Sequence, residues 1–303
     1  QVTRAVVPEG DQYAINIYVQ AHTAPHQWMS RSADVQRSSL REICMPGAHD
    51  AAMGKAHSCS TYANWNSTQT QNASVYDLLV RGGVRYFDLR AVIDEQNGLA
   101  LGHSSFVNKD INTGLKTLTL RMEGCLGYSV DDVISDVSRF LDENKNAHEL
   151  VLLEFSHFMN WKKHAKNDNK GFDDEDLQRL ANEISRRLGA NLVKGDSNTL
   201  TTRKLSDLTG SGSRVIVVFD TNSSVIDGSN GIHRLSALGL VNSYADSEAY
   251  GSMRDDQFRK LRENAGKNFL LSWTLTQKND STFAKSFMGL DSIERLAGVA
   301  NSR

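Results

Sequence analysis

Short apolar runs alternate with amphipathic stretches along most of this chain. In residues 129–144, Val130, Val133 and Val137 recur at helical spacing, which predicts an amphipathic helix. The run 149–155 is apolar almost throughout and is typical of a strand covered on both faces. The same alternation predicts the other elements: strands at 13–19, 41–45, 84–90, 99–103, 214–220, near 237–242 and at 268–273, and helices at 72–81, 173–188, 247–264 and 290–299.

This order of elements predicts the α/β class with a parallel sheet. Polar side chains follow several strands at their carboxyl ends, which favours a (β/α)8-type TIM barrel, with an open doubly wound sheet as the alternative. Only seven core strands are visible, so we expect a barrel that is incomplete or irregular at its last strand. No linker divides the chain: residues 1–30 form an N-terminal extension with one strand, and residues 31–303 form one barrel domain.

The composition excludes several functional classes. A hydrophobic content of 39% and a mean hydropathy of -0.44 are typical of a globular protein. The formal net charge of -2 provides no basic surface, so we expect no nucleic-acid partner. No apolar run approaches the roughly 18 residues of a membrane helix. The chain opens without the basic and apolar segments of a signal peptide, so we expect any such segment to have been removed, and the N-terminal Gln favours a secreted or lumenal protein.

The three cysteines bear on the compartment. Cys44 lies in the strand predicted at 41–45 and is expected to be a buried core thiol. Cys59 and Cys125 lie in polar, loop-like segments and can form a disulfide if the protein is secreted; their spacing fits no zinc motif. Glycosylation sequons begin at Asn66, Asn72, Asn222 and Asn279, although roughly three would occur by chance in a chain this rich in Asn, Ser and Thr.

Charged residues gather at the carboxyl ends of the first three core strands. His49 and Asp50 follow a Pro-Gly turn, Asp88 and Arg90 share one side of strand 84–90, and His103 ends strand 99–103. In a barrel these five side chains converge on one pocket. One imidazole can take a proton and another can give one, while a guanidinium matches the geometry and charge of a phosphate. The pattern predicts metal-free chemistry on a phosphate ester.

Each of these residues also has a structural interpretation. Asp50 can cap a turn, Asp88 and Arg90 can form an internal salt bridge, and His103 can be a hydrogen-bonded histidine at the mouth of a barrel. The convergence of all five on three successive strand ends favours catalysis over these separate roles.

At these residues the chain resembles the X-domain superfamily of phosphatidylinositol-specific phospholipases C, from about residue 28 to the end. It is most similar to the X-domain-only branch and the bacterial enzymes. The matching segments are Trp28-Met29-Ser30, Met45-Pro46-Gly47-Ala48-His49-Asp50-Ala51-Ala52-Met53, Gly83-Val84-Arg85-Tyr86-Phe87-Asp88-Leu89-Arg90, Gly102-His103, Leu150-Val151-Leu152-Leu153-Glu154-Phe155-Ser156-His157-Phe158, Val215-Ile216-Val217-Val218-Phe219-Asp220 and Phe269-Leu270-Leu271-Ser272-Trp273-Thr274-Leu275-Thr276-Gln277.

The resemblance implies a role for each of the five residues. His49 is the general base toward the inositol 2-hydroxyl, and His103, with Asp50 as its partner, is the general acid toward the diacylglycerol oxygen. Arg90 stands where metal-independent members use arginine, and Asp88 is a supporting carboxylate. The implied products are a cyclic inositol 1,2-phosphate and diacylglycerol, formed without a cofactor.

The chain also departs from the family pattern. Where the bacterial enzymes place Lys and Arg against the substrate, this chain offers Glu154 or Ser156, and Asp220, so we expect a substrate other than plain phosphatidylinositol. Glu154 is either a ligand for substrate or cation, or a member of a structural salt bridge. Tyr244 and Trp273 either stack on a sugar ring or belong to the core.

The family closes its barrel with an eighth strand that carries an aspartate for the general base, and this chain ends before such a strand. Either the sequence lacks its natural C-terminus, or the barrel is open or closed by other means, one of which is the strand near Ile15–Val19. Without a replacement carboxylate, His49 is expected to lose activity.

The partners follow from this interpretation. We expect a phospholipid or inositol-phosphodiester substrate, a monomer, and transient contact with a membrane surface through Trp65, Phe106, Met159 and Trp161, unless these only anchor loops. Two alternatives stay open. One is a metal-dependent glycerophosphodiesterase or sphingomyelinase-D-like enzyme that uses Glu154, Asp88 and Asp220; the other is an inactive barrel that binds lipid head groups or glycans.

Overall fold

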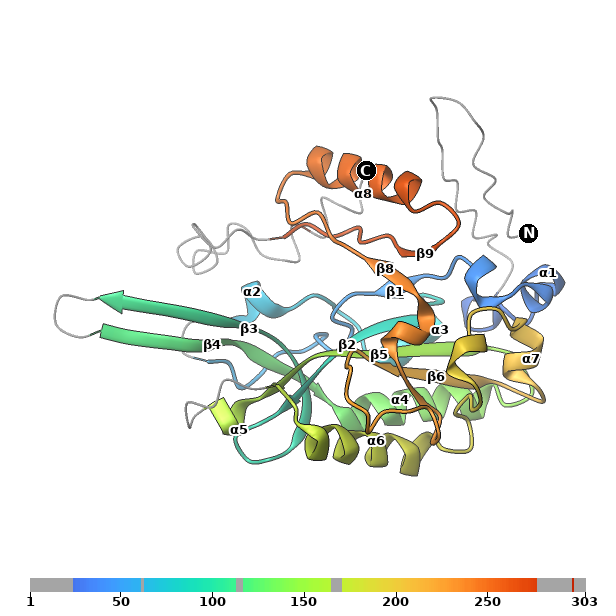
Figure 1. The fold of residues 1–303 in the computed structure, drawn as a ribbon, viewed down its shortest axis with the longest axis horizontal. Helices are drawn as coiled ribbons and strands as arrows, with labels where there is room; N and C mark the ends of the chain where they lie inside the picture. Colours follow the sequence, from blue (N-terminus) through green and yellow to red (C-terminus); the bar gives the residue numbers. More distant parts are fainter. Residues whose placement is uncertain (1–23, 61–62, 113–116, 165–170, 277–295, 297–303) are drawn as a thin grey trace.

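A seven-stranded sheet forms the centre of the protein (Figure 1). The structure is a computed structural model, and it describes residues 24–60, 63–112, 117–164, 171–276 and 296. The strand order is β4-β3-β2-β5-β6-β7, and the short β1 pairs with the amino-terminal half of β2. The strands are β1 (Gly47–Ala48), β2 (Tyr86–Ile93), β3 (Leu99–Asn112), β4 (Thr117–Ser129), β5 (Leu150–Asn160), β6 (Arg214–Phe219) and β7 (Ile232–Arg234).

Strands β1, β2, β5, β6 and β7 run parallel, whereas β3 and β4 form an antiparallel hairpin on the edge of β2. The described helices are α1 (Ala33–Arg37), α2 (Trp65–Thr68), α3 (Val75–Val80), α4 (Val130–Glu143), α5 (Trp161–His164), α6 (Asp174–Leu188), α7 (Leu205–Thr209) and α8 (Tyr250–Glu263). Short 3-10 helices lie at η1 (Pro25–Gln27), η2 (Leu40–Glu42), η3 (Ser197–Thr199) and η4 (Leu235–Leu238).

Helices α3, α4 and α6 cover one face of the sheet, where α4 and α6 lie side by side below it in Figure 1. The odd-numbered residues of β5, such as Leu153 and Phe155, pack under these helices. Their even-numbered neighbours Leu150 and Leu152 pack in a second cluster on the other face, together with Tyr86 of β2. The alternation of a strand therefore places Asp88 and Arg90, which share the parity of Tyr86, on this second face.

The α/β class and the irregular last strand are confirmed. Within the described residues the barrel does not close, because β8 (Leu240–Asn242) and β9 (Asn268–Leu270) form a separate two-stranded parallel sheet. The predictions for helices 72–81, 129–144, 173–188 and 247–264 correspond to α3, α4, α6 and α8. The predicted strand 13–19 and most of the predicted helix 290–299 lie outside the described residues.

One predicted strand is wrong, and three others differ from the structure in length. Residues 41–45 are not a strand: η2 covers Leu40–Glu42, β1 begins only at Gly47, and Cys44 is exposed rather than a core thiol. The strand predicted at 99–103 continues to Asn112 and pairs with β4, for which no strand was predicted. The predicted strands near 237–242 and at 268–273 shorten to β8 and β9, and β7 takes the next place in the main sheet instead.

Among the described residues, no helix has both the length and the apolar composition needed to cross a membrane.

Candidate active site

His49 follows directly after β1, at the carboxyl end of the parallel strands. Its Nδ1 lies 2.9 Å from Oδ2 of Asp88 on β2. A carboxylate only accepts hydrogen bonds, so Nδ1 carries the hydrogen and Nε2 keeps the lone pair of the ring. Nε2 lies 3.5 Å from Nη2 of Arg90, and 44% of the side chain is exposed. The lone pair of Nε2 therefore lies within hydrogen-bond distance of the guanidinium, on a ring that a ligand can reach.

Asp50 lies under both histidines. Its backbone has φ of 46°, a sharp turn after β1, and its side chain is 1% exposed. Arg90 Nε lies 2.7 Å from Oδ1 of Asp50, and Nε2 of His103 and of His49 lie 3.6 Å and 3.7 Å from Oδ2. Oδ1 is thus paired with the guanidinium, and Oδ2 lies where either imidazole can pair with it when protonated. Thr70 Oγ1 donates to the backbone carbonyl of Asp50 at 2.8 Å.

The carboxylates and the guanidinium shift the two imidazoles in opposite directions. Desolvation alone would lower the pKa of His49, but Asp50 and the hydrogen-bonded Asp88 outweigh it, and the pKa is raised above 6.5. Burial lowers the pKa of His103, with Asp50 opposing and Arg90 adding to the effect. Burial would raise the pKa of Asp88, but the hydrogen bond and charge of His49 together with Arg90 hold it below its ordinary value. Two imidazoles with separated pKa values share one carboxylate.

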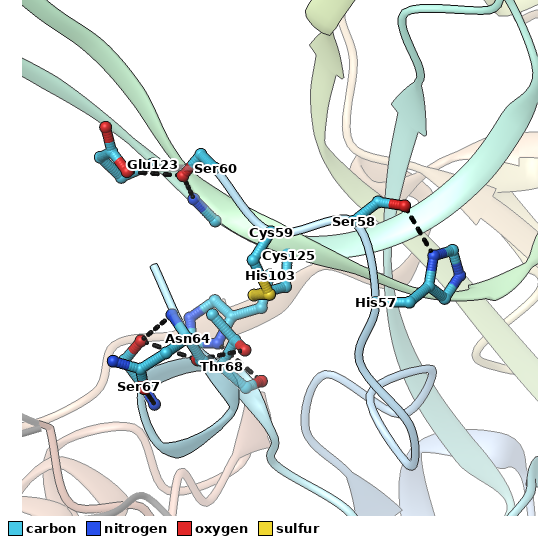
Figure 2. The surroundings of a disulfide bond; sticks show 11 residues. His57, Ser58, Cys59, Ser60, Asn64, Ser67, Thr68, His103, Glu123 and Cys125 are labelled. Carbon is cyan, nitrogen blue, oxygen red and sulfur yellow. Dashed lines mark hydrogen bonds between the residues drawn. A yellow bond between two sulfur atoms is a disulfide. The ribbon is translucent and has the colours of Figure 1, made fainter. Parts of the chain in front are cut away.

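A disulfide lies next to His103 (Figure 2). Cys125 of β4 is the direct strand partner of His103 and is bonded to Cys59, as predicted for an oxidising compartment. Backbone hydrogen bonds join His57 with Leu126 in both directions, at 2.8 Å and 3.0 Å. The disulfide and these bonds fasten the segment before α2 to the hairpin.

Helix α2 follows the fastened segment, and its last residue orients the imidazole of His103. Asn64 caps the helix, and at its end the carbonyl of Thr68 lies 3.2 Å from Nδ1 of His103 (Figure 2). Because a carbonyl only accepts, Nδ1 carries the hydrogen and Nε2 of His103 faces Asp50.

Ser156 and His157 end the apolar part of β5 beside Asp88. Ser156 Oγ lies 3.3 Å from Oδ1 of Asp88 and 2.8 Å from Nδ1 of His157. The side chain of His157 is exposed and its backbone has φ of 48°, a conformation that side chains other than glycine adopt at a cost. Ser156 is therefore a link between Asp88 and a third imidazole.

Glu154 lies deeper on the same face, paired in register with Asp88. It is buried, and the hydroxyl of Tyr86 donates a hydrogen bond to its Oε2. Burial and, second, the charge of Asp220 raise the pKa of Glu154 to about 7. Asp220 follows β6 at the same end of the sheet and is exposed. The sequence predicted that Glu154 is either a ligand or a member of a salt bridge. Its described contact is the hydrogen bond from Tyr86, and not a salt bridge.

Two residues predicted to bind substrate lie elsewhere. The ring of Trp273 packs against Tyr250 and Phe258, with centroids 5.9 Å and 5.6 Å away, so in the described part of the chain it belongs to a small separate core. Tyr244 is 58% exposed in the loop before α8. No described contact joins either residue to the His49 group.

Two of the four residues of the predicted membrane patch are buried: Met159 and Trp161 pack with Val92, Ala100 and Leu126. Trp65 is 42% exposed. The side chain of Phe106 lies outside the described part of the structure.

The structure adds His157 and Thr68 to the residues identified from sequence. The polar pair Ser156-His157 interrupts an apolar run and was a usable signal. No sequence signal could identify the carbonyl of Thr68, because every residue has a backbone carbonyl. Among the described residues, no group of three or more His, Cys, Asp or Glu side chains is arranged to hold a metal ion.

Solved bacterial structures share this fold. The phosphatidylinositol-specific phospholipase C of Listeria monocytogenes matches with a TM-score of 0.54 at 17% identity, over 85% of this chain and 81% of that chain. Two structures of the Staphylococcus aureus enzyme, one of them a mutant, match with TM-scores of 0.60 and 0.59 at 15% and 16% identity, over 92% of this chain and 84% of theirs. At such identities the likeness establishes the fold. No protein-family model matches the chain, and no curated protein matches its sequence.

Proposed function

We propose that the protein is a phosphodiesterase of the phosphatidylinositol phospholipase C type. It cleaves an inositol or glyco-inositol phospholipid by attack of the inositol 2-hydroxyl, giving a cyclic inositol phosphate and diacylglycerol. The observation that carries the proposal is the shared arrangement of His49, Arg90 and His103 around the buried carboxylate of Asp50. The fold common to the bacterial phospholipases C supports it.

The first half of the reaction uses His49. Asp88 holds Nδ1 at 2.9 Å, so Nε2 takes the proton of the attacking hydroxyl while the new phosphorus–oxygen bond forms. Asp88 here provides the orienting carboxylate that an eighth strand supplies in the family. Negative charge grows on the phosphoryl oxygens, and the guanidinium of Arg90, 3.5 Å from His49 Nε2, offsets it.

The second half uses His103. As the bond from phosphorus to the diacylglycerol oxygen breaks, Nε2 of protonated His103 gives its proton to that oxygen. Thr68 fixes the ring from the opposite nitrogen, and Asp50 stabilises the imidazolium before transfer. The proton lost by the 2-hydroxyl and the proton gained by the leaving oxygen balance.

The proposal extends to the surroundings of the enzyme. The Cys59–Cys125 disulfide favours an oxidising, secreted or lumenal location. A lipid substrate requires transient contact with a membrane surface, and one of the Staphylococcus aureus structures concerns modulation of that enzyme's membrane binding. We propose that the protein works as a monomer.

Phosphorus NMR of the protein with phosphatidylinositol micelles, with and without EDTA, tests the reaction. We expect a cyclic phosphodiester signal that survives EDTA. A monoester that forms only without EDTA would instead indicate the metal-dependent alternative, and an absence of turnover of phosphatidylinositol and glycosylated inositol lipids would contradict the proposal.

Replacing His49 tests the assignment of the base. His49→Ala should lower kcat about a hundredfold to ten-thousandfold while circular dichroism shows an intact fold. His26→Ala is the matched control, because His26 lies in η1 at the amino-terminal end of the strands, where its carbonyl accepts from Arg85. Retained activity in His49→Ala would rule out this mechanism.

A further inference from the structure

We propose that His157 binds the polyol head group, with Nε2 accepting a hydrogen bond from a head-group hydroxyl, and that Ser156 positions it. This inference rests on the proposed function and adds a substrate contact to it. Ser156 thereby changes from a predicted substrate ligand to a positioning residue.

A β-bulge places His157 at the site. Arg90 of β2 pairs with Ser156, but Val92 pairs with Met159, so His157 and Phe158 together stand opposite one residue of β2. An extra residue of this kind bends the strand and redirects its side chains. The φ of 48° at His157 lies within this bulge.

The bulge places Phe158, instead of His157, on the helix-covered face of the sheet. Continued alternation after Leu153 and Phe155 would point residue 157 under the helices. Phe158 takes that place instead: its ring lies 5.6 Å from the ring of Phe219 and packs against the helix-side core. His157 is left exposed at the end of the sheet that carries Asp88. The bulge thus directs the imidazole of His157, and not the ring of Phe158, away from the helix-side core.

The hydrogen bonds fix the tautomer of this imidazole. Asp88 Oδ1 only accepts, so the single hydrogen of Ser156 Oγ points to it across 3.3 Å. Ser156 Oγ then accepts from Nδ1 of His157 at 2.8 Å. Nε2 of His157 is left with a lone pair, as in His49, and one carboxylate orients both rings. Desolvation and the charge of Arg90 lower the pKa of His157, which keeps the ring neutral at neutral pH.

The surrounding charges disfavour an anionic partner for Nε2, and a hydroxyl is the donor that an inositol head group offers. Asp50, Asp88 and Asp220 act on His157 as negative charges, and Arg90 as a positive one. Arg90 is already paired with Asp50 and faces the scissile phosphate in the proposed reaction. A lone pair in a field with three carboxylates accepts from a neutral donor and repels a second phosphate. The ligand class is therefore a hydroxyl-rich head group rather than a phosphorylated one.

Calorimetric binding of two soluble probes tests the contact. We expect His157→Ala to weaken binding of myo-inositol 1-phosphate about five- to tenfold, and to leave binding of glycerol phosphate unchanged. His157→Gln, whose amide oxygen can replace the Nε2 lone pair, should restore most of the affinity. With phosphatidylinositol, KM should rise in His157→Ala while kcat stays nearly constant.

His148→Ala is the matched control, because His148 precedes the same strand at its other end and lies near Thr209. Unchanged affinity for the inositol phosphate in His157→Ala would overturn the inference, and equal weakening of both probes would place the contact on the phosphate and overturn it too. Binding that depends on His157 without lipid turnover would support the inference and contradict the proposed function. A wild-type protein that does not bind inositol phosphate would contradict both.

Discussion

At the scale of single residues, two carboxylates organise the site. Asp88 holds the ring of His49 directly and His157 through Ser156, and it also accepts from the backbone nitrogen of Asp50 at 3.3 Å. Asp50 contacts both proposed catalytic histidines. A buried carboxylate is stable only when such partners compensate for its lost hydration. The charges that hold the fold here therefore also set the protonation of the imidazoles.

The opposite pKa shifts of His49 and His103 predict a plateau in the pH dependence of kcat/KM. Below the lowered pKa of His103, the rate rises with pH as His49 loses its proton. Between the two pKa values, the gain in neutral His49 cancels the loss of protonated His103. Above the raised pKa of His49, the rate falls. Asp88→Asn removes a charge that raises the pKa of His49, so the basic limb should move to lower pH.

Rates measured from about pH 5 to about pH 9, with NMR titration of the histidine ring protons, check this prediction. Asp220→Asn is the control, because the charge of Asp220 acts on Glu154 and His157 rather than on the two proposed catalytic histidines. A basic limb that stays in place in Asp88→Asn would contradict the assignment of His49.

The raised pKa of Glu154 predicts that the free energy of unfolding depends on pH. Its pKa is raised from 4.5 to about 7 in the folded protein, so folding binds its proton more tightly. The resulting stabilisation is complete below about pH 4.5 and is lost as the pH rises through about 7. Glu154→Gln resembles the protonated acid and can still accept from Tyr86. It should raise the free energy of unfolding by up to about 3 kcal/mol near pH 8.5, and leave it nearly unchanged near pH 4.5.

Urea unfolding at both pH values measures this difference. Glu95→Gln, in the exposed turn between β2 and β3, should change the free energy of unfolding little at either pH. Equal stabilities of wild type and Glu154→Gln near pH 8.5 would contradict a raised pKa.

At the scale of elements, the Cys59–Cys125 disulfide connects stability with His103, the proposed general acid. It joins residues 66 apart in sequence, so replacing both cysteines by Ala should cost about 4 kcal/mol in the free energy of unfolding. The same change frees the segment before α2, whose Thr68 carbonyl orients His103. We therefore expect kcat to fall for the diacylglycerol leaving group, and to fall much less for an aryl leaving group that needs no protonation.

Kinetics with both substrates, at a temperature where the variant is folded, measure this selectivity. Cys44→Ala is the control, because that thiol is exposed and lies outside the disulfide. An equal loss with both leaving groups would show that the disulfide supports the fold without orienting His103.

The elements also show how far sequence reasoning reached. Strand parity correctly placed Asp88 and Arg90 on one side of β2, because alternation is a property of the backbone. The length of the β3–β4 hairpin was missed, because residues 105–123 mix polar and apolar positions and so resemble a loop. The turn Asp94–Gly98 was a usable signal: Asp94 Oδ1 accepts from the nitrogen of Gly98, a typical side-chain brace of a tight turn.

The error at residues 41–45 has a different cause. Ile43 and Met45 pack partly against the second core cluster from a segment that follows η2 and belongs to no strand. A hydrophobic pattern reports burial, and it does not report hydrogen-bonded pairing. For the same reason, the convergence of the five charged residues depended only on where strands end and was predictable, whereas the bulge at His157 depends on the pairing register of β2 with β5.

At the scale of the whole molecule, a buried ion pair joins the chain before α1 to the amino-terminal end of the sheet. Arg85 donates to Glu149 through Nε at 3.0 Å and Nη2 at 2.7 Å, and both side chains are fully buried. Nη2 also donates to the carbonyl of His26 at 2.9 Å, and Glu149 Oε1 accepts from the nitrogen of Ser30 at 2.8 Å. Three segments distant in sequence therefore meet at one charge pair, at the opposite end of the strands from the site.

Removing one member of this pair should unfold the protein more easily without changing the chemistry. Arg85→Met leaves Glu149 charged and buried, so the free energy of unfolding should fall by about 3 to 5 kcal/mol. The double variant Arg85→Met/Glu149→Leu removes both charges and should recover much of that loss. Urea unfolding measures both values, with Arg139→Met as the control, because the Arg139–Glu143 pair is exposed and its loss should change the free energy of unfolding little. Comparable losses in Arg85→Met and Arg139→Met would show that burial of the Arg85–Glu149 pair does not determine its contribution.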